Sequence, residues 1–262
     1  MNDKSNLIAL LTDFGTRDYF VGAMKGVILS ANPNALAVDI THEIESQNVA
    51  AASFTLRACY KNFPEKTIFV AVVDPGVGSR RKAILVETES YFFIAPDNGL
   101  LSFVFNDEQK HKVYELTNEK FFAANVSRTF HGRDVFAPVA AHLSNGVSPS
   151  EFGSQTNDYI RLDETKPSKT GSGNIIGSVI HIDKFGNLIS NLTKENLHSE
   201  KFVLEIGGAK IENLKNYFAE VAKSEIMMIF GSADFLEIVA FQDSAQRLLN
   251  VEVGCEIVVT NS

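Results

Sequence analysis

The sequence has no tryptophan, only two cysteines and no excess of positive charge. Its 24 lysines and arginines are outnumbered by 32 acidic residues, which gives a formal net charge of −8. Proteins that bind nucleic acid neutralise phosphates with a basic face, so we expect no nucleic-acid partner. Cys59 and Cys255 lie far apart in apolar stretches. That placement is typical of reduced core cysteines and predicts neither a disulfide framework nor a metal site.

Long hydrophobic runs are also missing. No apolar stretch reaches the roughly 18 residues that a membrane-spanning helix needs. Residues 1–6 (MNDKSN) are too short and too polar for a signal peptide. We therefore expect no membrane association and a cytoplasmic location. Hydrophobic residues still make up 45% of the chain, which is ordinary for a globular protein with a buried core.

The first part of the chain alternates between strand-like and helix-like patterns. This alternation predicts an α/β domain with a mostly parallel sheet over residues 1–165. The run 67–73 (TIFVAVV) is rich in β-branched residues and suits a strand covered on both faces. The expected strands are 7–12, 35–40, 67–73, 83–87 and 91–95, and the expected helices are 19–30, 48–63 and 131–143.

The character of the sequence changes near residues 163–173 (DETKPSKTGSG), a polar stretch with Gly, Ser and Pro that is typical of a linker. Short β-like runs separated by turns follow it. They predict a smaller, all-β, barrel-like domain over residues 174–262. Its expected strands are 175–182, 202–206, 226–229, 235–240 and 256–260.

The stretch 71–82 (AVVDPGVGSRRK) has a strand-like run, an acid, a Gly-rich turn and cations. Such a combination suggests a phosphate-binding loop. That kind of loop, however, needs a Lys and a Ser or Thr after its last glycine and a helix to follow. Here a β-like run follows instead, and no dinucleotide fingerprint is present. A tight β-turn with two solvated arginines, Arg80 and Arg81, is the plain structural alternative.

Two acids follow expected strands of the first domain. Asp13 comes after the run 7–12, and Asp74 after the run 67–73. Ligands of open α/β sheets bind outside the carboxyl ends of the strands. If both strands belong to one parallel sheet, both acids lie at that edge. A carboxylate there can accept two hydrogen bonds from a ribose diol.

Five ordered motifs identify a family. TDFGTRD, VDPGVGSRR, APDNG, TFHGRDVFAP and IDKFGN resemble the S-adenosylmethionine hydroxide adenosyltransferases, hydrolases related to fluorinase and chlorinase. The resemblance runs from about residue 7 to the C-terminus. It implies an N-terminal α/β domain, a C-terminal β domain and a homotrimer with active sites between neighbouring subunits. It also implies conversion of S-adenosylmethionine and water into adenosine and L-methionine, with no metal and no cofactor.

The same resemblance implies a catalytic triad of Asp74, Arg81 and His131, in which motif spacing selects Arg81 over Arg80. The halogenases carry Tyr at the positions of Asp74 and His131, and Ser at that of Gly132. Phe20 stands where the halogenases have a Ser that contacts the halide. The chain therefore matches the enzymes that use water. His131 would orient the water or take its proton, and Arg81 would favour the deprotonated form of that water.

Further roles are implied for substrate binding. Asp13 would hold the ribose hydroxyls, Asn187 would read the adenine edge and Asp183 would face the methionine ammonium. Phe218, or else Tyr217, would stack on adenine. A C-terminal segment that closes over the substrate would contribute Ser232, Glu237 and the backbone near Ala240. The loop of residues 241–243 departs from the family pattern at a place expected to lie near adenine.

Taken without the resemblance, these residues have ordinary structural roles. Asp74 would be a turn residue, His131 would lie near a helix start, and Arg81 would pair with a nearby glutamate. The FGN stretch would be a turn, Phe218 a core residue, and Arg133 with Asp134 a structural pair. Two other functions are a nucleoside-binding or sensing protein without turnover and a halide-dependent nucleosyl transferase.

Overall fold

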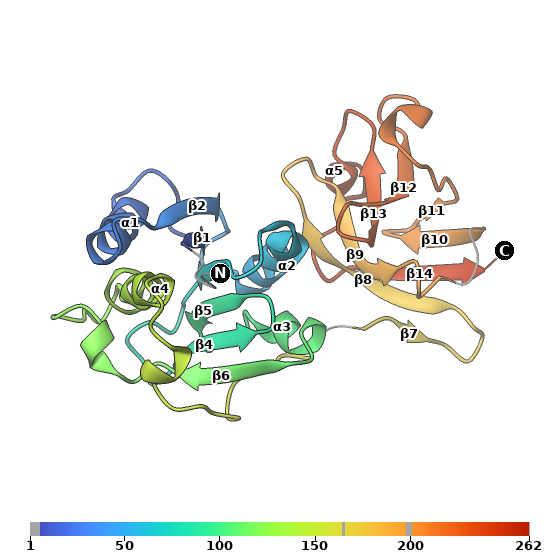
Figure 1. Ribbon diagram of the computed structural model, residues 1–262. Coiled ribbons are helices and arrows are strands. Elements are labelled where there is room, and N and C mark those ends of the chain that lie inside the picture. The colour runs from blue at the N-terminus through green and yellow to red at the C-terminus, as the bar shows by residue number, and fades with distance from the viewer. Residues whose placement is uncertain (1–5, 164–165, 198–200, 262) are drawn as a thin grey trace. The chain divides into compact units, whose positions relative to one another are not determined.

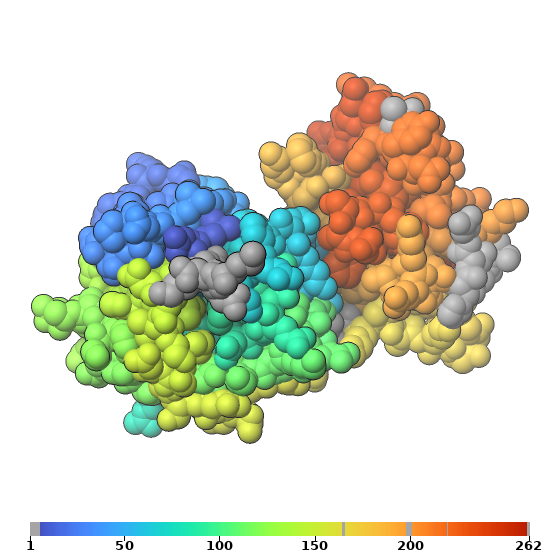
Figure 2. All heavy atoms as spheres, viewed as in Figure 1, coloured from blue at the N-terminus to red at the C-terminus, as the bar shows by residue number. Residues whose placement is uncertain are grey.

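The computed structural model describes residues 6–163, 166–197 and 201–261. The chain forms two compact units, Met1–Asp163 and Glu164–Ser262, which we call unit 1 and unit 2 and describe separately (Figure 1). Within each unit, side chains fill the spaces between the ribbons (Figure 2). Residues 164 and 165 of the expected linker lie outside the described residues. In the described part of the chain, we find no helix with the length and apolar character to cross a membrane.

Unit 1 is built on one six-stranded sheet with the order β2-β1-β3-β5-β4-β6. Strands β2, β1, β3 and β5 are parallel, while β4 runs antiparallel to both of its neighbours. The expectation of a mostly parallel sheet is therefore confirmed. The strands are β1 (Leu7–Thr12), β2 (Leu36–Thr41), β3 (Ile68–Val72), β4 (Ala83–Thr88), β5 (Phe92–Pro96) and β6 (His111–Glu115).

Both faces of this sheet are covered, which gives unit 1 two hydrophobic clusters. Successive side chains of a strand point to opposite faces. In β1, Ile8 and Leu10 accordingly belong to one cluster, while Ala9 and Leu11 belong to the other. Helices α1 (Phe20–Ala31) and α4 (Ala137–Ser144) cover the first face, and α2 (Val49–Cys59) and α3 (Ser102–Asp107) cover the second.

Two predicted helices differ from the sequence-based expectation. The helix expected at 131–143 begins instead as a π-helical turn, η3 (Gly132–Phe136), and continues as α4. The helix expected at 48–63 ends earlier and is followed by η1 (Tyr60–Asn62). The strand β6 and the helix α3 were not predicted. Two further short 3₁₀ turns are η2 (Glu119–Phe121) and η4 (Pro149–Glu151).

Unit 2 is an antiparallel, barrel-like β domain, as predicted. Its main path is β11-β10-β14-β8-β9-β13-β12, and β7 pairs with β8. Alternate residues of β8 are buried, so one face of this strand points into the core. The elements are β7 (Ser168–Lys169), β8 (Ile175–Ile182), β9 (Leu188–Thr193), β10 (Phe202–Ile206), β11 (Ala209–Ile211), η5 (Phe218–Glu220), β12 (Ile226–Phe230), β13 (Phe235–Ala240), α5 (Ala245–Leu249) and β14 (Glu256–Asn261).

Candidate active site

The carboxyl edge of the unit 1 sheet gathers the polar residues that the sequence singled out. Asp13 directly follows β1, and Asp74 follows β3 after one further residue. Strand β4 runs the other way, and its first residue, Ala83, pairs with the last residue of β5, Pro96. Since β4 therefore starts where its parallel neighbours end, Arg81 is delivered to the same edge as Asp74.

A compact turn connects Asp74 to Arg81. The Asp74 carbonyl accepts a hydrogen bond from the Val77 amide at 3.2 Å. The Ser79 hydroxyl donates to the Gly76 carbonyl at 2.6 Å and accepts from the Arg81 amide at 3.2 Å. The strand β4 follows, so this turn has no helix N-terminus to offer a phosphate group. Its hydrogen bonds instead set the position of the two charged side chains at its ends.

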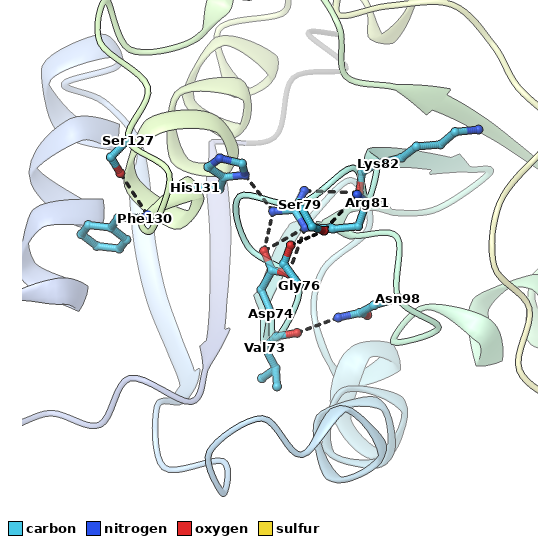
Figure 3. A network of polar contacts seen from close by, with 10 residues as sticks. All are labelled: Val73, Asp74, Gly76, Ser79, Arg81, Lys82, Asn98, Ser127, Phe130 and His131. Carbon is cyan, nitrogen blue, oxygen red and sulfur yellow. Dashed lines mark hydrogen bonds and ion pairs between the residues drawn. The ribbon is translucent and has the colours of Figure 1, made fainter.

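Asp74, Arg81 and His131 meet in one chain of polar contacts (Figure 3). Arg81 Nε donates to Asp74 Oδ1 and Oδ2 at 2.9 and 3.0 Å, and Arg81 Nη2 also donates to Oδ2. The same Nη2 lies 2.8 Å from His131 Nδ1. The side chains of Arg81 and Asp74 are 10% and 6% exposed, so this ion pair is largely screened from water. The structure thus brings together the three residues of the expected triad.

The contact with Arg81 determines the protonation state of His131. A guanidinium has donors only, so Nδ1 must accept and cannot carry a hydrogen. The imidazole is therefore neutral, with its proton on Nε2. Burial, followed by the positive charge of Arg81, lowers the pKa of His131 below its ordinary value of 6.5, against the opposing influence of Asp74, Asp134 and a hydrogen bond with the Ser127 backbone. His131 can accept a proton only after the contact with Arg81 is broken.

Neighbouring residues hold the triad from two sides. The Asn98 side chain donates to the Val73 carbonyl at 2.8 Å, and so fixes the backbone just before Asp74 (Figure 3). The Arg81 guanidinium lies over the Phe136 ring, 5.4 Å from its centre, as in a cation–π contact. Sequence reasoning assigned no role to Asn98, although its place in APDNG, directly after a strand, was a usable signal.

Asp13 lies in a loop that is fixed by its own hydrogen bonds. Its Oδ2 accepts from the Gln47 amide at 2.8 Å. The buried His42 supports the same loop, since its Nδ1 lies 2.9 Å from Thr12 Oγ1 and its carbonyl accepts from the Gly15 amide at 2.7 Å. A carboxylate offers about four lone-pair positions. Asp13 therefore keeps acceptor capacity for a diol.

In unit 2, Asp183 and Asn187 lie in the turn between β8 and β9. Asp183 Oδ1 accepts from the amides of Phe185 and Asn187 at 2.8 and 2.9 Å, and its Oδ2 accepts from the Asn187 side chain at 2.8 Å. The FGN stretch is therefore a turn, as the structural alternative held, with its acid and its amide already paired. This pairing orients both groups before any ligand arrives.

A second acid lies near this turn. Glu237 on β13 pairs with Ile189 on β9, and burial, followed by the negative charge of Asp183, raises its pKa. Its side chain also approaches Gly231 so closely that a Cβ there would meet Oε1 at 1.7 Å. Ser232, which follows Gly231, is exposed, and Ala240 is buried at the end of β13. Two carboxylates within electrostatic reach of each other favour a cationic ligand group.

Among the described residues of unit 2, Phe185, Tyr217 and Phe218 have exposed aromatic rings. Phe218 is 40% and Tyr217 62% exposed, which contradicts a core role for Phe218. Phe185, in the turn between Asp183 and Asn187, is 65% exposed. Phe185 lies in the IDKFGN motif, but the sequence did not predict a role for it. Its signal was an aromatic residue in a polar turn, where no core is available to bury it. Among the described residues, no group of three or more His, Cys, Asp or Glu side chains could hold a metal ion.

Comparisons with known proteins agree with the two-unit division. A family model described as SAM hydroxide adenosyltransferase N-terminal domain matches residues 8–153, and its C-terminal counterpart matches residues 177–258. The chain is 37% identical to the (R)-S-adenosyl-L-methionine hydrolase of Methanocaldococcus jannaschii, over 98% of this chain and 96% of that protein. Identity to the hydrolase of the same name from Thermus thermophilus is 31%, over 95% and 98%.

A more distantly related sequence and two crystal structures are also similar to this chain. A fluorinase from an Actinoplanes species is 29% identical over 73% of each chain. The crystal structure of an uncharacterized conserved protein from Thermotoga maritima has a TM-score of 0.90 and 37% identity, over 97% of this chain and 100% of that one. A conserved hypothetical protein from Thermus thermophilus has a TM-score of 0.80 and 28% identity, over 97% and 99%.

The turn between Asp74 and Arg81 can be tested through Gly78. This residue has φ +76°, and a Cβ on it would meet the Arg128 carbonyl oxygen at 2.3 Å. We expect Gly78→Ala to lower the free energy of unfolding by about 1–3 kcal/mol. Gly26→Ala is the control, because nothing lies within 4 Å of that Cβ and the residue is helical, so stability should rise by about 0.5–1 kcal/mol. Urea unfolding would measure both, and equal effects would contradict the geometry of the turn.

The protonation state of His131 can be tested by ¹⁵N NMR of the imidazoles. We expect the Nε2–H tautomer and a pKa below 6.5. Arg81→Ala removes a positive charge beside the ring and should raise this pKa. His142 is an internal control, since burial, followed by the charge of Lys120, lowers its pKa without Arg81. A proton on Nδ1 of His131 in the unmodified protein would overturn the assignment.

Proposed function

This chain belongs to the SAM hydroxide adenosyltransferase family, and on that basis we propose that it hydrolyses S-adenosyl-L-methionine to adenosine and L-methionine. The observation that carries the proposal is the joined set of Asp74, Arg81 and neutral His131 at the carboxyl edge of the unit 1 sheet. The protein is thus an enzyme that uses water where the related halogenases use a halide. Relatives named for the (R)-epimer support that epimer as the preferred substrate.

The reaction needs an activated water more than any other group. Its oxygen attacks C5′ of the ribose, the C5′–S bond breaks, and the electron pair of that bond stays on sulfur. Methionine leaves as a neutral thioether, so neither a general acid nor a metal is required for the leaving group. The water gives up one proton, which passes to the solvent with the positive charge that the sulfonium has lost, and adenosine keeps the other on its 5′ hydroxyl. Most of the barrier therefore concerns the weak nucleophile and its alignment with the C–S bond.

Arg81 is the residue best placed to favour a hydroxide-like nucleophile. Its Nε and Nη2 are engaged by Asp74 and His131, while the contact that Nη1 makes with the described residues is a long one of 3.4 Å to the Lys82 carbonyl. We propose that Nη1 holds the attacking oxygen. A positive charge within about 4–6 Å of a water favours its deprotonated form. Alignment of the two reacting partners contributes up to about 7–11 kcal/mol in favourable cases.

The substrate would be held by groups of both units. Asp13 would bind the ribose hydroxyls with its remaining lone pairs. Asp183 and Glu237 would bind the methionine ammonium, because a cation relieves the repulsion between them. Asn187 would read adenine, while Ser232 and the backbone near Ala240 would complete the enclosure. The family resemblance supports a homotrimer in which neighbouring subunits supply the two sets of groups. The two free cysteines, Cys59 and Cys255, support a reducing, cytoplasmic compartment.

The proposed reaction is tested with both sulfonium epimers of S-adenosylmethionine, with and without chloride. Adenosine and methionine should form in equal amounts without halide, faster from the (R)-epimer. Arg81→Ala should lower kcat at least about 100-fold, because it removes the charge that stabilises the nucleophile. Separation of the products by chromatography gives the rates.

Each other outcome of that assay favours a different function. Product that appears only with chloride, as a chlorinated nucleoside, would indicate a halide-dependent nucleosyl transferase. Binding of adenosine by calorimetry without any turnover would indicate a nucleoside-binding protein. Equal rates from both epimers would contradict the proposed epimer preference and leave hydrolysis intact.

The adenine-stacking residue can be identified with two single variants. We expect Phe185→Ala to raise KM roughly 5- to 100-fold, since stacking of a base on an aromatic ring is worth about 1–3 kcal/mol. Phe218→Ala is the matched comparison, because Phe218 was the residue predicted from the sequence and is the less exposed of the two. Steady-state kinetics would rank them. A larger effect for Phe218→Ala would instead support the residue that the resemblance implies.

A further inference from the structure

We propose that Asp134 is a positioning residue for His131: its buried carboxylate anchors Ser127, and Ser127 in turn fixes the segment that leads into His131, so that the imidazole stays where Arg81 meets it. This inference rests on the proposed function, because it assigns a role in the same active site. Asp134 is not a catalytic residue in this proposal, since its carboxylate is engaged by protein groups.

The Asp134 carboxylate is buried and fully engaged on both oxygens. Its side chain is 2% exposed. Arg133 donates to it through a two-pronged contact, from Nε to Oδ1 at 2.6 Å and from Nη2 to Oδ2 at 3.0 Å. The Ser127 amide donates to Oδ2 at 2.8 Å. Although burial raises the pKa of Asp134, the hydrogen bonds from Arg133 and Ser127 outweigh it and hold that pKa below its usual value. The group is therefore an anion at neutral pH.

A short path of contacts leads from this anion to the catalytic imidazole. Asp134 holds Ser127 through the Ser127 amide. The Ser127 hydroxyl in turn accepts from the amide of Phe130 at 3.0 Å, one residue before His131 (Figure 3). The Asp134 carbonyl accepts from the Ala123 amide at 2.8 Å, which fixes the start of the same loop. The segment before His131 is thus tied to Asp134 at its beginning and its middle.

The helix register makes this arrangement possible. In η3 the Ala137 amide bonds to the Gly132 carbonyl, five residues earlier, instead of four as in an α-helix. This wider turn places Asp134 beneath the loop while His131 stays at the helix start. Gly132 packs tightly against Met24 and Phe14, since a Cβ there would come within 3.2–3.3 Å of them. Packing therefore holds the start of the helix in place. The position of the loop before His131 depends on the hydrogen bonds of that loop.

Charge provides a second link between Asp134 and His131. The charged groups that act on the imidazole are Arg81, Asp74 and Asp134, and the two acids favour the protonated ring. Removal of the Asp134 charge should therefore lower the pKa of His131. If neutral His131 is required for activity, the acid limb of the kcat–pH profile should move to lower pH by the same amount. A residue that only stabilises the fold would leave both quantities unchanged.

The test compares Asp134→Asn with Asp107→Asn. Asp107 is a matched control, because Arg57 binds it in the same two-pronged way at 3.0 and 2.9 Å, in the same unit and without a contact to the triad. Asparagine keeps the shape of the side chain but replaces one acceptor oxygen by an NH₂ donor and removes the charge, so it cannot accept from all three N–H groups that Asp134 binds. We expect Asp134→Asn to lower kcat roughly 10- to 100-fold with KM unchanged, as small displacements of reacting groups do. Asp107→Asn should leave kcat and its pH profile unchanged.

A measurement without substrate separates this inference from the proposed function. The pKa of His131, followed by NMR, should fall in Asp134→Asn and stay constant in Asp107→Asn, whatever reaction the enzyme catalyses. Absence of hydrolysis by the unmodified protein would refute the function alone. An unchanged His131 pKa together with an unchanged kcat–pH profile in Asp134→Asn would overturn the positioning role.

A second variant covers the case in which Asp134→Asn does not fold. Arg133→Gln leaves the Asp134–Ser127 hydrogen bond in place and removes only the partly exposed cation, whose side chain is 36% exposed. The positioning role predicts nearly normal kcat for this variant. A fall in kcat of about 10-fold or more would show that the ion pair itself matters, and would contradict the path through Ser127.

Discussion

The ion pair between Asp74 and Arg81 is the interaction on which the arrangement of the site depends. It exists because one strand of the unit 1 sheet, β4, runs against its neighbours, so that the residues before it reach the edge where β3 ends. The pair is largely buried, and loss of one partner from such a pair typically costs about 3–5 kcal/mol. The same two side chains therefore contribute to the stability of the fold and to the site. Either charge without its partner would be buried unpaired and would lower the free energy of unfolding.

The charge balance of the pair explains why a neutral histidine can lie beside a guanidinium. Asp74 offsets most of the charge of Arg81, and the remaining donor on Nη2 binds the lone pair of His131 Nδ1. The imidazole is then locked as a neutral ring with its single hydrogen on Nε2. The site thus holds one anion, one cation and one neutral ring. In this state its main contribution is to orient and polarise an incoming oxygen.

Sequence patterns predicted the architecture, and the family resemblance implied three residues that the structure brings together, but neither predicted the tertiary contacts around them. The run 67–73 predicted β3 because every residue of a strand covered on both faces is apolar. Strand β9 was missed because Ser190 and Asn191 interrupt its apolar pattern. Both are buried and bonded to residues distant in sequence, Ser190 to Leu236 and Asn191 to Ser178. The family resemblance could imply Asp74, Arg81 and His131 because its motifs are local, whereas the position of Asn98 depends on a contact with Val73, 25 positions away. Tertiary hydrogen bonds of this kind leave no periodic signal in a sequence.

The packing around Gly132 restricts which residues can occupy this position. The family resemblance places a serine of the halogenases at this position, while here Met24, Phe130 and Phe14 already surround the place a Cβ would take, at 3.2 to 3.3 Å. A side chain at this point would need Met24, Phe130 and Phe14 to give way by a few tenths of an ångström. A change of residue here therefore also involves the packing behind the site, and not the side chains of Asp74, Arg81 and His131 alone.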